Sequence, residues 1–533
     1  MVGNLRTTTV LAVVGMMLVQ LALVAGAAVP AVPPVAVAAP PRMVPSNSSP
    51  QVSRRPLRSA GRAAGKAARS LLLPLPLRVV SLVRKPLRDL NFWGRAMRIY
   101  GSYKGQQLVL RRKQYDRQPA SELFNTTHEI NSRRMLDLCL SMRGFYLKTG
   151  QFLATRHDFM PLQYTTKLSR LHDDVPPMPA REVRRILERE LKGPLDKFFS
   201  SIELDFPLGS ASVAQVHKGV WRASGETVAV KVQYPTAERM MRGDLRNLRV
   251  LAEFLQRTEL KFDLLSAIKE LQRQIGNEFD FQREASNMEM VGEKLRKLVP
   301  EVRVPRRVFA TRRVLVMSFL EGDNLRKLAE YRGSEVSAAG GLLTQIMRQR
   351  AGKKLLDVLA KSWGNMIFKI RAFNADPHPG NICISRTQAL GQHGAVGLLD
   401  WGQVKLVSDT LAADFSNLVL AIKSRNEDSI VDAFFKLGVC VADPSDRHTV
   451  SKIALSMLDT QKVPGFIIDP FDPRNSLKTN SVTKMPAEMY FLVRTVQLMR
   501  GICFAFGLDY SLADQWAPLA KETLQALKSA GTL

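Results

Sequence analysis

Asp376-Pro377-His378-Pro379-Gly380-Asn381 is the most informative segment of this 533-residue chain. Its two prolines are incompatible with a regular helix, so we expect a rigid loop that presents the Asp376 carboxylate outward. A short strand follows the loop, and a predicted hairpin leads to a second segment, Leu398-Leu399-Asp400-Trp401-Gly402. Two carboxylates and the amide of Asn381 therefore occur in a fixed order around one hairpin.

This order matches the phosphoryl-transfer site of protein kinases. In that site a loop aspartate orients or deprotonates the attacking hydroxyl group, an asparagine five residues later binds Mg²⁺, and an aspartate after a hairpin binds Mg²⁺ again. Asp376, Asn381 and Asp400 have the same order and nearly the same spacing. A turn with a purely structural role would explain the Asp, Pro, Gly and Asn residues at 376–381, but it would leave Asp400 unexplained.

A loop of small residues lies upstream, at Gly209 to His217, and the next strand carries Lys231 in the sequence Val-Ala-Val-Lys. Small side chains let backbone N–H groups approach a phosphate closely, and a lysine on the following strand adds a positive charge. Alone, this pattern also fits an ordinary edge strand. Together with the loop at residues 376–381 it predicts nucleotide contacts at Ala211, Ser212, Val213, Ala214, Gln215 and Lys231.

Hydrophobic periodicity predicts a mixed unit followed by a helical one. Alternation of β-branched residues predicts a strand at Glu226 to Tyr234,. Helical spacing continues from about Glu238 to Leu298, two more strands are expected within Arg307 to Leu320, and the chain is mostly helical from Leu325,. A further helical region precedes the mixed unit, and the class is therefore α+β.

Several separated motifs give the chain a resemblance to the UbiB/ADCK family of atypical kinases, also called ABC-one kinases, over about residues 120–520. Lys148-Thr149-Gly150-Gln151 matches the family's Lys-x-Gly-Gln signature, and Glu278-Phe279-Asp280 matches its Glu-x-Asp motif. The small-residue loop and the loop at residues 376–381 match as well.

The resemblance implies an atypical protein-kinase-like fold of two lobes. We expect a β-rich N-lobe at residues 181–322, a helical C-lobe at residues 323–533 and a family-specific helical extension at residues 121–180. It also implies that Lys148, with Gln151, is regulatory: its counterpart in the family contacts the acids that correspond to Glu278 and Asp280, and the extension caps the cleft.

Helix geometry supports these assignments. Lys148 and Gln151 are three residues apart, so they share one helix face, as do Asp280 and Glu284, four residues apart. Glu284 is our predicted partner of Lys231, and both are predicted catalytic residues with Asp376. A glycine inside a helix costs about 1 kcal/mol, so the glycine of the Lys-x-Gly-Gln signature predicts close packing.

The chain departs from the family pattern in ways that affect function. Trp401 replaces a phenylalanine of the metal-binding triplet. Asn374 stands where many members have histidine, and we expect this asparagine to alter the packing of the loop without touching the carboxylates. Gly209 and Ser210 leave the choice between ATP and ADP open. No Ala-Pro-Glu follows Asp400, which argues against ordinary phosphorylation of peptides,.

From the resemblance we expect an ATP-binding (or ADP-binding), Mg²⁺-dependent kinase or ATPase. Its metal ligands are Asn381 and Asp400, and it serves quinone or other isoprenoid-lipid metabolism at an organelle membrane. The expected partners are a nucleotide, a membrane lipid or quinone precursor, and a membrane surface. The alternative is a catalytically weak, nucleotide-sensing membrane scaffold. The oligomeric state stays open.

The net charge of +29 invites a reading as a nucleic-acid binder, but its distribution argues against one,. Residues 1–88 hold twelve Lys and Arg and no Asp or Glu, which leaves +17 for the other 445 residues. The remaining chain has no basic stripe interleaved with aromatic residues, as a nucleic-acid surface needs. The four cysteines are far apart, which makes a zinc module or a disulfide scaffold unlikely,.

The first 70 residues are expected to be a targeting leader, and residues 71–120 a basic linker with an amphipathic helix from about Arg88. An apolar run at residues 10–29, followed by small residues, fits a signal peptide or an uncleaved membrane anchor,. The Arg-, Ser- and Ala-rich stretch after it is typical of an organelle transit peptide. Import into a secondary plastid is favoured over a mitochondrial leader or a plain anchor.

Overall fold

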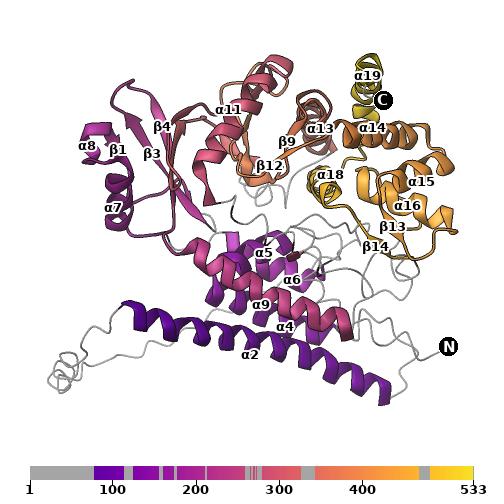
Figure 1. The fold of residues 1–533 in the computed structure, drawn as a ribbon, viewed down its shortest axis with the longest axis horizontal. Helices are drawn as coiled ribbons and strands as arrows, with labels where there is room; N and C mark the ends of the chain where they lie inside the picture. The colour runs from indigo at the N-terminus through magenta and orange to yellow at the C-terminus, as the bar shows by residue number, and fades with distance from the viewer. Residues whose placement is uncertain are drawn as a thin grey trace, which may run out of the picture. The chain divides into compact units, whose positions relative to one another are not determined.

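A computed structural model shows the arrangement of the chain (Figure 1). It describes residues 77–112, 124–154, 160–172, 177–210, 213–258, 279–325, 342–466 and 480–531, with single positions at 265, 268, 269, 272 and 276. The predicted leader, its apolar run, Ala211, Ser212 and Glu278 lie outside the described residues.

The basic helix predicted from about Arg88 begins earlier, as α2 (Leu77–Arg112). It carries nine Lys and Arg residues against one acid, Asp89. The chain divides into two compact units between Arg95 and Ala96, inside this helix. The extension and both lobes belong to the unit that contains Ala96–Leu533.

The extension consists of α4 (Asn125–Met142), α5 (Gly144–Ala154) and α6 (Leu162–Leu168), followed by a 3₁₀ turn, η2 (Ser169–His172). Buried polar groups join it to the C-terminal half of α2: the hydroxyl of Tyr103 lies 2.8 Å from Nδ1 of His128 and 2.9 Å from the hydroxyl of Tyr164. These three side chains are at most 2% exposed. Hydrogen bonding among them offsets the cost of burying polar groups.

The N-lobe is built on an antiparallel sheet in the order β1-β3-β4-β7-β6, with β2 added beside β3. Its strands are β1 (Phe199–Ile202), β2 (Gly209–Ser210), β3 (Ala214–Trp221), β4 (Thr227–Gln233), β6 (Arg307–Ala310) and β7 (Val314–Ser318). The predicted strand at residues 226–234 and the two predicted within residues 307–320 are thereby confirmed. α7 (Ala180–Leu191) and α8 (Leu195–Phe198) precede the sheet, and valines of β4 and β7 form one core with α7.

Two long helices fall within the region predicted as helical, α9 (Ala237–Thr258) and α11 (Phe281–Leu298). α11 contacts β6 and β7 of the N-lobe sheet. A small sheet follows in the order β5-β11-β10-β8, built from β5 (Val302–Arg303), β8 (Asp323–Asn324), β10 (Ile382–Ile384) and β11 (Val396–Leu398). The predicted hairpin is the pair β10–β11, with Ile382 opposite Leu398.

The C-lobe is mainly helical. α13 (Leu342–Gly364) continues into a π-helix, η4 (Asn365–Ile370), and then into β9 (Ala372–Asn374), which pairs with β12 (Val404–Leu406). The remaining elements are η5 (Pro379–Asn381), α14 (Asp409–Ser424), α15 (Glu427–Lys436), β13 (Cys440–Val441), α16 (Arg447–Leu458), β14 (Val482–Lys484), α18 (Ala487–Phe506) and α19 (Leu512–Ser529). The α+β class is confirmed.

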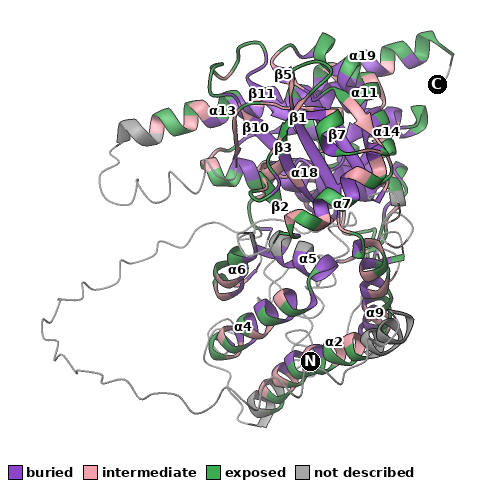
Figure 2. Cartoon of the chain, turned by 90° about the vertical axis from the view of Figure 1, so that its left-hand side faces the viewer, coloured by how far each residue is buried: buried purple, intermediate pink, exposed green. Residues whose placement is uncertain are grey.

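Burial follows these elements. Figure 2 shows buried residues concentrated on the strands of both lobes and on α18, whereas α4 has a buried and an exposed side. Within the part of the chain that the structure describes, one segment is long and apolar enough to cross a membrane, Glu488–Phe506 in α18. Since 78% of that segment is buried inside the protein, it forms a core helix of the C-lobe.

Candidate functional site

The N-lobe contributes a buried lysine–glutamate pair. Lys231 lies on β4, and its ammonium group is 2.7 and 3.0 Å from the two carboxylate oxygens of Glu284, in the first turn of α11. Side chains alternate along a strand, so Val230 and Val232 point into the apolar core while Lys231 points to the opposite face,. Lys231 is 8% exposed and Glu284 4%, so water screens the pair weakly,.

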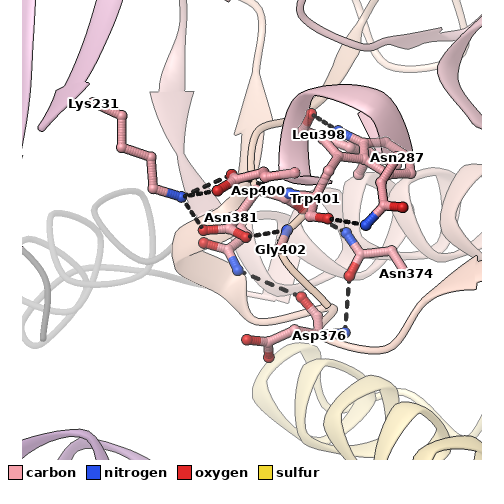
Figure 3. Close-up of polar contacts among 10 residues, drawn as sticks. Lys231, Asn287, Asn374, Asp376, Asn381, Leu398, Asp400, Trp401 and Gly402 are labelled. Atoms are coloured by element: carbon pink, nitrogen blue, oxygen red, sulfur yellow. Dashed lines mark hydrogen bonds and ion pairs between the residues drawn. The ribbon is translucent and has the colours of Figure 1, made fainter. Parts of the chain in front are cut away.

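The same ammonium group reaches the C-lobe. It lies 2.9 Å from Oδ2 of Asp400, whose other carboxylate oxygen accepts a hydrogen bond from the backbone of Gly402 at 3.0 Å. Burial by itself lowers the pKa of Lys231, but the carboxylates of Asp400 and Glu284 outweigh burial, and the net pKa is raised. Lys231 therefore stays charged and holds both carboxylates around it; Figure 3 shows its ammonium group beside Asp400.

The loop after β9 presents Asp376. It is short and cross-braced: Nδ1 of His378 accepts from the backbone of Gly380 at 3.1 Å, and the carbonyl oxygen of Asn381 accepts from the backbone of Leu399 at 2.9 Å. The amide nitrogen of Asn381 points to the carbonyl oxygen of Asp376 at 3.5 Å. The two motifs of the sequence are thus brought together, with Asn381 between Asp400 and Asp376 (Figure 3).

Asn374 joins the two motifs through the backbone. Its side-chain nitrogen donates to the carbonyl oxygen of Asp400 at 2.7 Å, and its side-chain oxygen accepts from the backbone N–H of Asp376 at 2.9 Å. The indole of Trp363 donates to the carbonyl oxygen of Asn374 at 2.6 Å. Asn374 therefore sets the distance between the two loops without contacting either carboxylate, as the sequence led us to expect.

An arginine that sequence reasoning missed completes the site. Arg494 of α18 lies 2.9 Å from Oδ1 of Asp376, donates to Oε1 of Gln403, and is only 4% exposed. An arginine inside an apolar helix was a signal that a buried acid lies nearby. Arg500, one and a half turns further, instead donates to the backbone carbonyl oxygen of Asp459.

The small-residue loop is described only in part, because Ala211 and Ser212 lie outside the described residues. The carbonyl oxygen of Val213 accepts from the backbone of Tyr234 at 2.9 Å, which ties the end of the loop to the end of β4. Ala214 is buried as the first residue of β3. The predicted phosphate contacts of this loop stay predictions.

The side chain of Gln215 is not available to a nucleotide. Its side chain is fully buried: Oε1 accepts from the backbone of Met178 at 2.7 Å, and Nε2 lies 2.8 Å from Nε2 of His217. The second position of β3 faces the core, so this amide anchors the segment before α7. Because Gln215 stands opposite Val232 and its neighbour Val216 stands opposite Lys231, the side chain of Gln215 points away from the face of Lys231. The spacing of the loop alone did not reveal this direction, and a contact of the Gln215 backbone with a nucleotide stays a prediction.

Only part of the predicted regulatory set is described. Lys148 and Gln151 lie on α5, and the structure describes neither side chain; Glu278 lies outside the described residues. Asp280 is the N-cap of α11, and its carboxylate accepts from two backbone N–H groups of the first turn at 3.1 Å each. It therefore sets where the helix that carries Glu284 begins.

The glycine of the Lys-x-Gly-Gln signature has the packing reason that we predicted. A Cβ atom on Gly150 would lie 2.8 Å from Sγ of Cys139 on α4, and Cδ1 of Leu171 would be closer still. Both neighbours are fully buried. α5 can therefore pack against α4 and η2 only with glycine at this position.

The residues present fit an Mg²⁺ ion. The ion prefers oxygen ligands and is usually held by one or two protein side chains with substrate phosphates and water. Asp400 and Asn381 supply such oxygens, and the side chain of Asp400 is 38% exposed. Among the described residues, no three His, Cys, Asp or Glu side chains form a metal cage.

A β-rich lobe with a Lys–Glu pair, joined to a helical lobe that presents Asp376, Asn381 and Asp400, defines a protein of the kinase-like fold. Residues 170–434 match the ABC1 atypical kinase-like domain. The chain belongs to the ABC1 family of atypical kinase-like proteins, and this confirms the resemblance to the UbiB/ADCK family.

Relatives carry kinase names. The chain is 28% identical over 410 residues to AarF domain-containing protein kinase 1 of Gallus gallus, which covers 74% of each chain. It is 28% identical over 370 residues to Protein ACTIVITY OF BC1 COMPLEX KINASE 8, chloroplastic, of Arabidopsis thaliana, covering 67% of this chain and 44% of that one. Among solved structures, the Rv3197–erythromycin complex from Mycobacterium tuberculosis is similar, with a TM-score of 0.49, 20% identity and coverage of 76% and 98%.

Proposed function

We propose that this protein binds ATP or ADP with Mg²⁺ and acts as an atypical kinase or ATPase. The observation that carries the proposal is the ammonium group of Lys231, which lies within 2.7–3.0 Å of both Glu284 and Asp400. One cation thereby links the helix of the N-lobe to the metal-binding carboxylate of the C-lobe. Protein kinases require the Lys–Glu ion pair, and an aspartate that binds Mg²⁺, to be in place before they transfer a phosphoryl group.

Each residue then has a role. Lys231 would bind the α- and β-phosphates, with Glu284 holding it in place, and Asn381 and Asp400 would hold Mg²⁺, which neutralises phosphate charge. Asp376 would orient the acceptor hydroxyl group or water molecule and accept its proton. Since Arg494 binds Oδ1 of Asp376, the proton would go to Oδ2.

The acceptor is proposed to be a small molecule or water. Only eight residues separate Asp400 from the start of α14 at Asp409, and three of them form β12, which pairs back onto β9. This leaves no segment of the length on which protein kinases align a peptide, between the Asp-Phe-Gly and Ala-Pro-Glu motifs. We propose a quinone precursor or another isoprenoid lipid as the substrate class.

We further propose an organelle membrane as the place of action, and a plastid in particular. The name of the Arabidopsis relative includes the word chloroplastic, and the leader expected at residues 1–70 agrees with import. α2, with nine basic residues against one acid, suits an anionic membrane surface,. Localisation of a fluorescent fusion to mitochondria would overturn the plastid assignment.

Turnover of nucleotide by the purified protein tests the enzymatic proposal. Wild type, Asp400→Asn and the control Asp432→Asn are assayed with ATP and Mg²⁺ against a panel of quinone precursors and lipids. Asp432 is an exposed acid of α15 with a surface ion pair to Arg447, so its loss should change little. We expect Asp400→Asn to lose turnover by about 10²-fold or more; equal rates in all three proteins would refute the assignment.

A nucleotide-sensing membrane scaffold is the second candidate. It is favoured by the ion pair between Asp376 and the buried Arg494, which engages the carboxylate that a kinase uses as its base. A scaffold would bind Mg·ATP or Mg·ADP tightly and show no turnover with any acceptor. Nucleotide affinity measured beside turnover therefore separates the two candidates.

A further inference from the structure

A cavity of about 490 Å³ lies in the described chain away from the carboxylates of the candidate site. Its wall comes from α13, from the turn that follows α11, and from the loop of the β10–β11 hairpin, residues 389–392. On α13, Lys354, Asp357, Val358 and Lys361 follow one another at the spacing of a single helix face. The cavity is therefore formed by three separate elements.

The hairpin loop has a defined shape. The side chain of Gln392 accepts from the backbone of Ala389 at 3.0 Å, and the backbone of Gln392 donates to the carbonyl oxygen of Ala389 at 2.9 Å. The turn after α11 is bonded to the same hairpin, because Val396 donates to the carbonyl oxygen of Glu301 at 3.0 Å. The wall is thus built by hydrogen bonds and does not depend on loose side chains.

The wall contains two lysines, Lys354 and Lys361, and two carboxylates, Glu301 and Asp357. Lys361 lies 2.9 Å from Glu301, and Asp357 is bound by Lys353 at 2.9 Å and by the hydroxyl of Tyr510 at 3.0 Å. Both carboxylates therefore have partners. Lys354 lines the cavity, is exposed, and forms no ion pair with any residue that the structure describes.

The rest of the wall includes apolar surface. Val358 is 5% exposed, and Leu390 and Ala389 come from the hairpin loop opposite. An uncompensated ammonium group beside apolar side chains is complementary to an anion with an apolar body. A compact aromatic carboxylate has both features, whereas inorganic phosphate lacks the apolar part.

All three wall elements lead directly to residues of the candidate site. α11 carries Glu284 at its beginning and reaches the cavity just beyond its end. β10 follows Asn381 directly, and β11 ends two residues before Asp400. α13 continues through η4 and β9 to Asp376.

We propose that this cavity is a regulatory site for a small organic anion with an apolar body. The anion pairs with Lys354 and packs on Val358 and Leu390. Its binding biases the relative positions of α11, the β10–β11 hairpin and α13, and so alters nucleotide binding by reciprocal coupling. The regulatory part rests on the proposed nucleotide site, but occupancy of the cavity does not.

Binding is tested first, without nucleotide, by calorimetric titration of the full chain with benzoate. We expect binding to wild type and to Lys528→Glu, a control at an exposed lysine of α19, and affinity weaker by about tenfold or more in Lys354→Glu. Ala389→Trp, which fills the cavity without changing charge, should also lose binding. Absence of binding to wild type, or equal affinity in all four proteins, would overturn the site.

Regulation is tested by the affinity for Mg·ADP with and without saturating benzoate. We expect a change of about fivefold or more in wild type and none in Lys354→Glu; identical affinities in wild type would refute the coupling. Asp400→Asn separates the two proposals, because it should weaken Mg·ADP binding while benzoate binding stays at the wild-type level. A loss of benzoate binding in Asp400→Asn would contradict an independent cavity.

Discussion

Replacing Gly150 with alanine is expected to destabilise the protein, even though alanine is the better helix former. The added Cβ would lie 2.8 Å from Sγ of Cys139 and closer still to Cδ1 of Leu171. Both side chains are 0% exposed, so neither can turn into solvent to make room. The substitution therefore forces α5 away from α4 and η2.

Two effects of opposite sign compete in this variant. Alanine gains about 1 kcal/mol of helix stability over glycine, whereas overpacking a filled core costs about 1–3 kcal/mol. Non-bonded carbon atoms prefer separations of about 3.5–4.0 Å, and the new contacts would be far shorter, so the upper part of that range applies. We expect a net loss of about 1–2 kcal/mol.

Gly101→Ala is the matched control. Gly101 lies on α2, is exposed, and a Cβ there would meet no heavy atom within 4 Å. Only helix propensity acts at this position, so the variant should gain about 1 kcal/mol. Thermal unfolding followed by circular dichroism should move the two melting temperatures in opposite directions; a rise in both would refute the packing argument for the Lys-x-Gly-Gln glycine.

Three further predictions concern the extension and the site. Burial lowers the pKa of His128 to about 4, so below about pH 6.5 the unfolded chain binds a proton that the folded chain does not, and acidification to about pH 4 should cost about 3 kcal/mol. The denaturant midpoint should depend less steeply on pH in His128→Gln than in wild type, and an equal slope in both proteins would contradict this. Asn374→Ala removes the side chain that bridges Asp376 and Asp400, and should slow turnover by about tenfold or more with little change in nucleotide affinity; a change in affinity alone would point to a different role. Arg494→Gln leaves Asp376 without its buried cation and should change turnover while the affinity for Mg·ADP stays constant. Calorimetry with Mg·ADP and a turnover assay measure the two quantities, and a loss of Mg·ADP binding would contradict this role.

Much of the site was predictable because its residues stand at fixed offsets within single elements. Asp376 and Asn381 share one loop, Asp400 follows the adjoining hairpin, and the loop prolines limit what that loop can do. The Lys231–Glu284 pair was predicted from the family resemblance, and helix spacing, which puts Glu284 on the same face as Asp280, selected the glutamate. Local geometry transmits such information through the backbone alone.

Other contacts were not predictable in this way. The spacing of the small-residue loop did not show that Gln215 faces the core, because a strand presents alternate residues to opposite faces and only packing against α7 selects the face. The early start of α2 was missed because Pro86 and a sparse hydrophobic pattern weaken the periodic signal there. In each case the missing information lies in a neighbouring element.

The sequence by itself determined the class of fold, the family, and the order of the residues that would hold a nucleotide and a metal ion. The tertiary structure decided which side chains restrain those residues: Arg494 binds Asp376 from 118 residues away, and Lys231 reaches Asp400 from 169 residues away. Spacing along a helix or strand is set by backbone geometry, and it is therefore legible in the sequence. Contacts over such separations depend on how whole elements pack, and no local pattern encodes them.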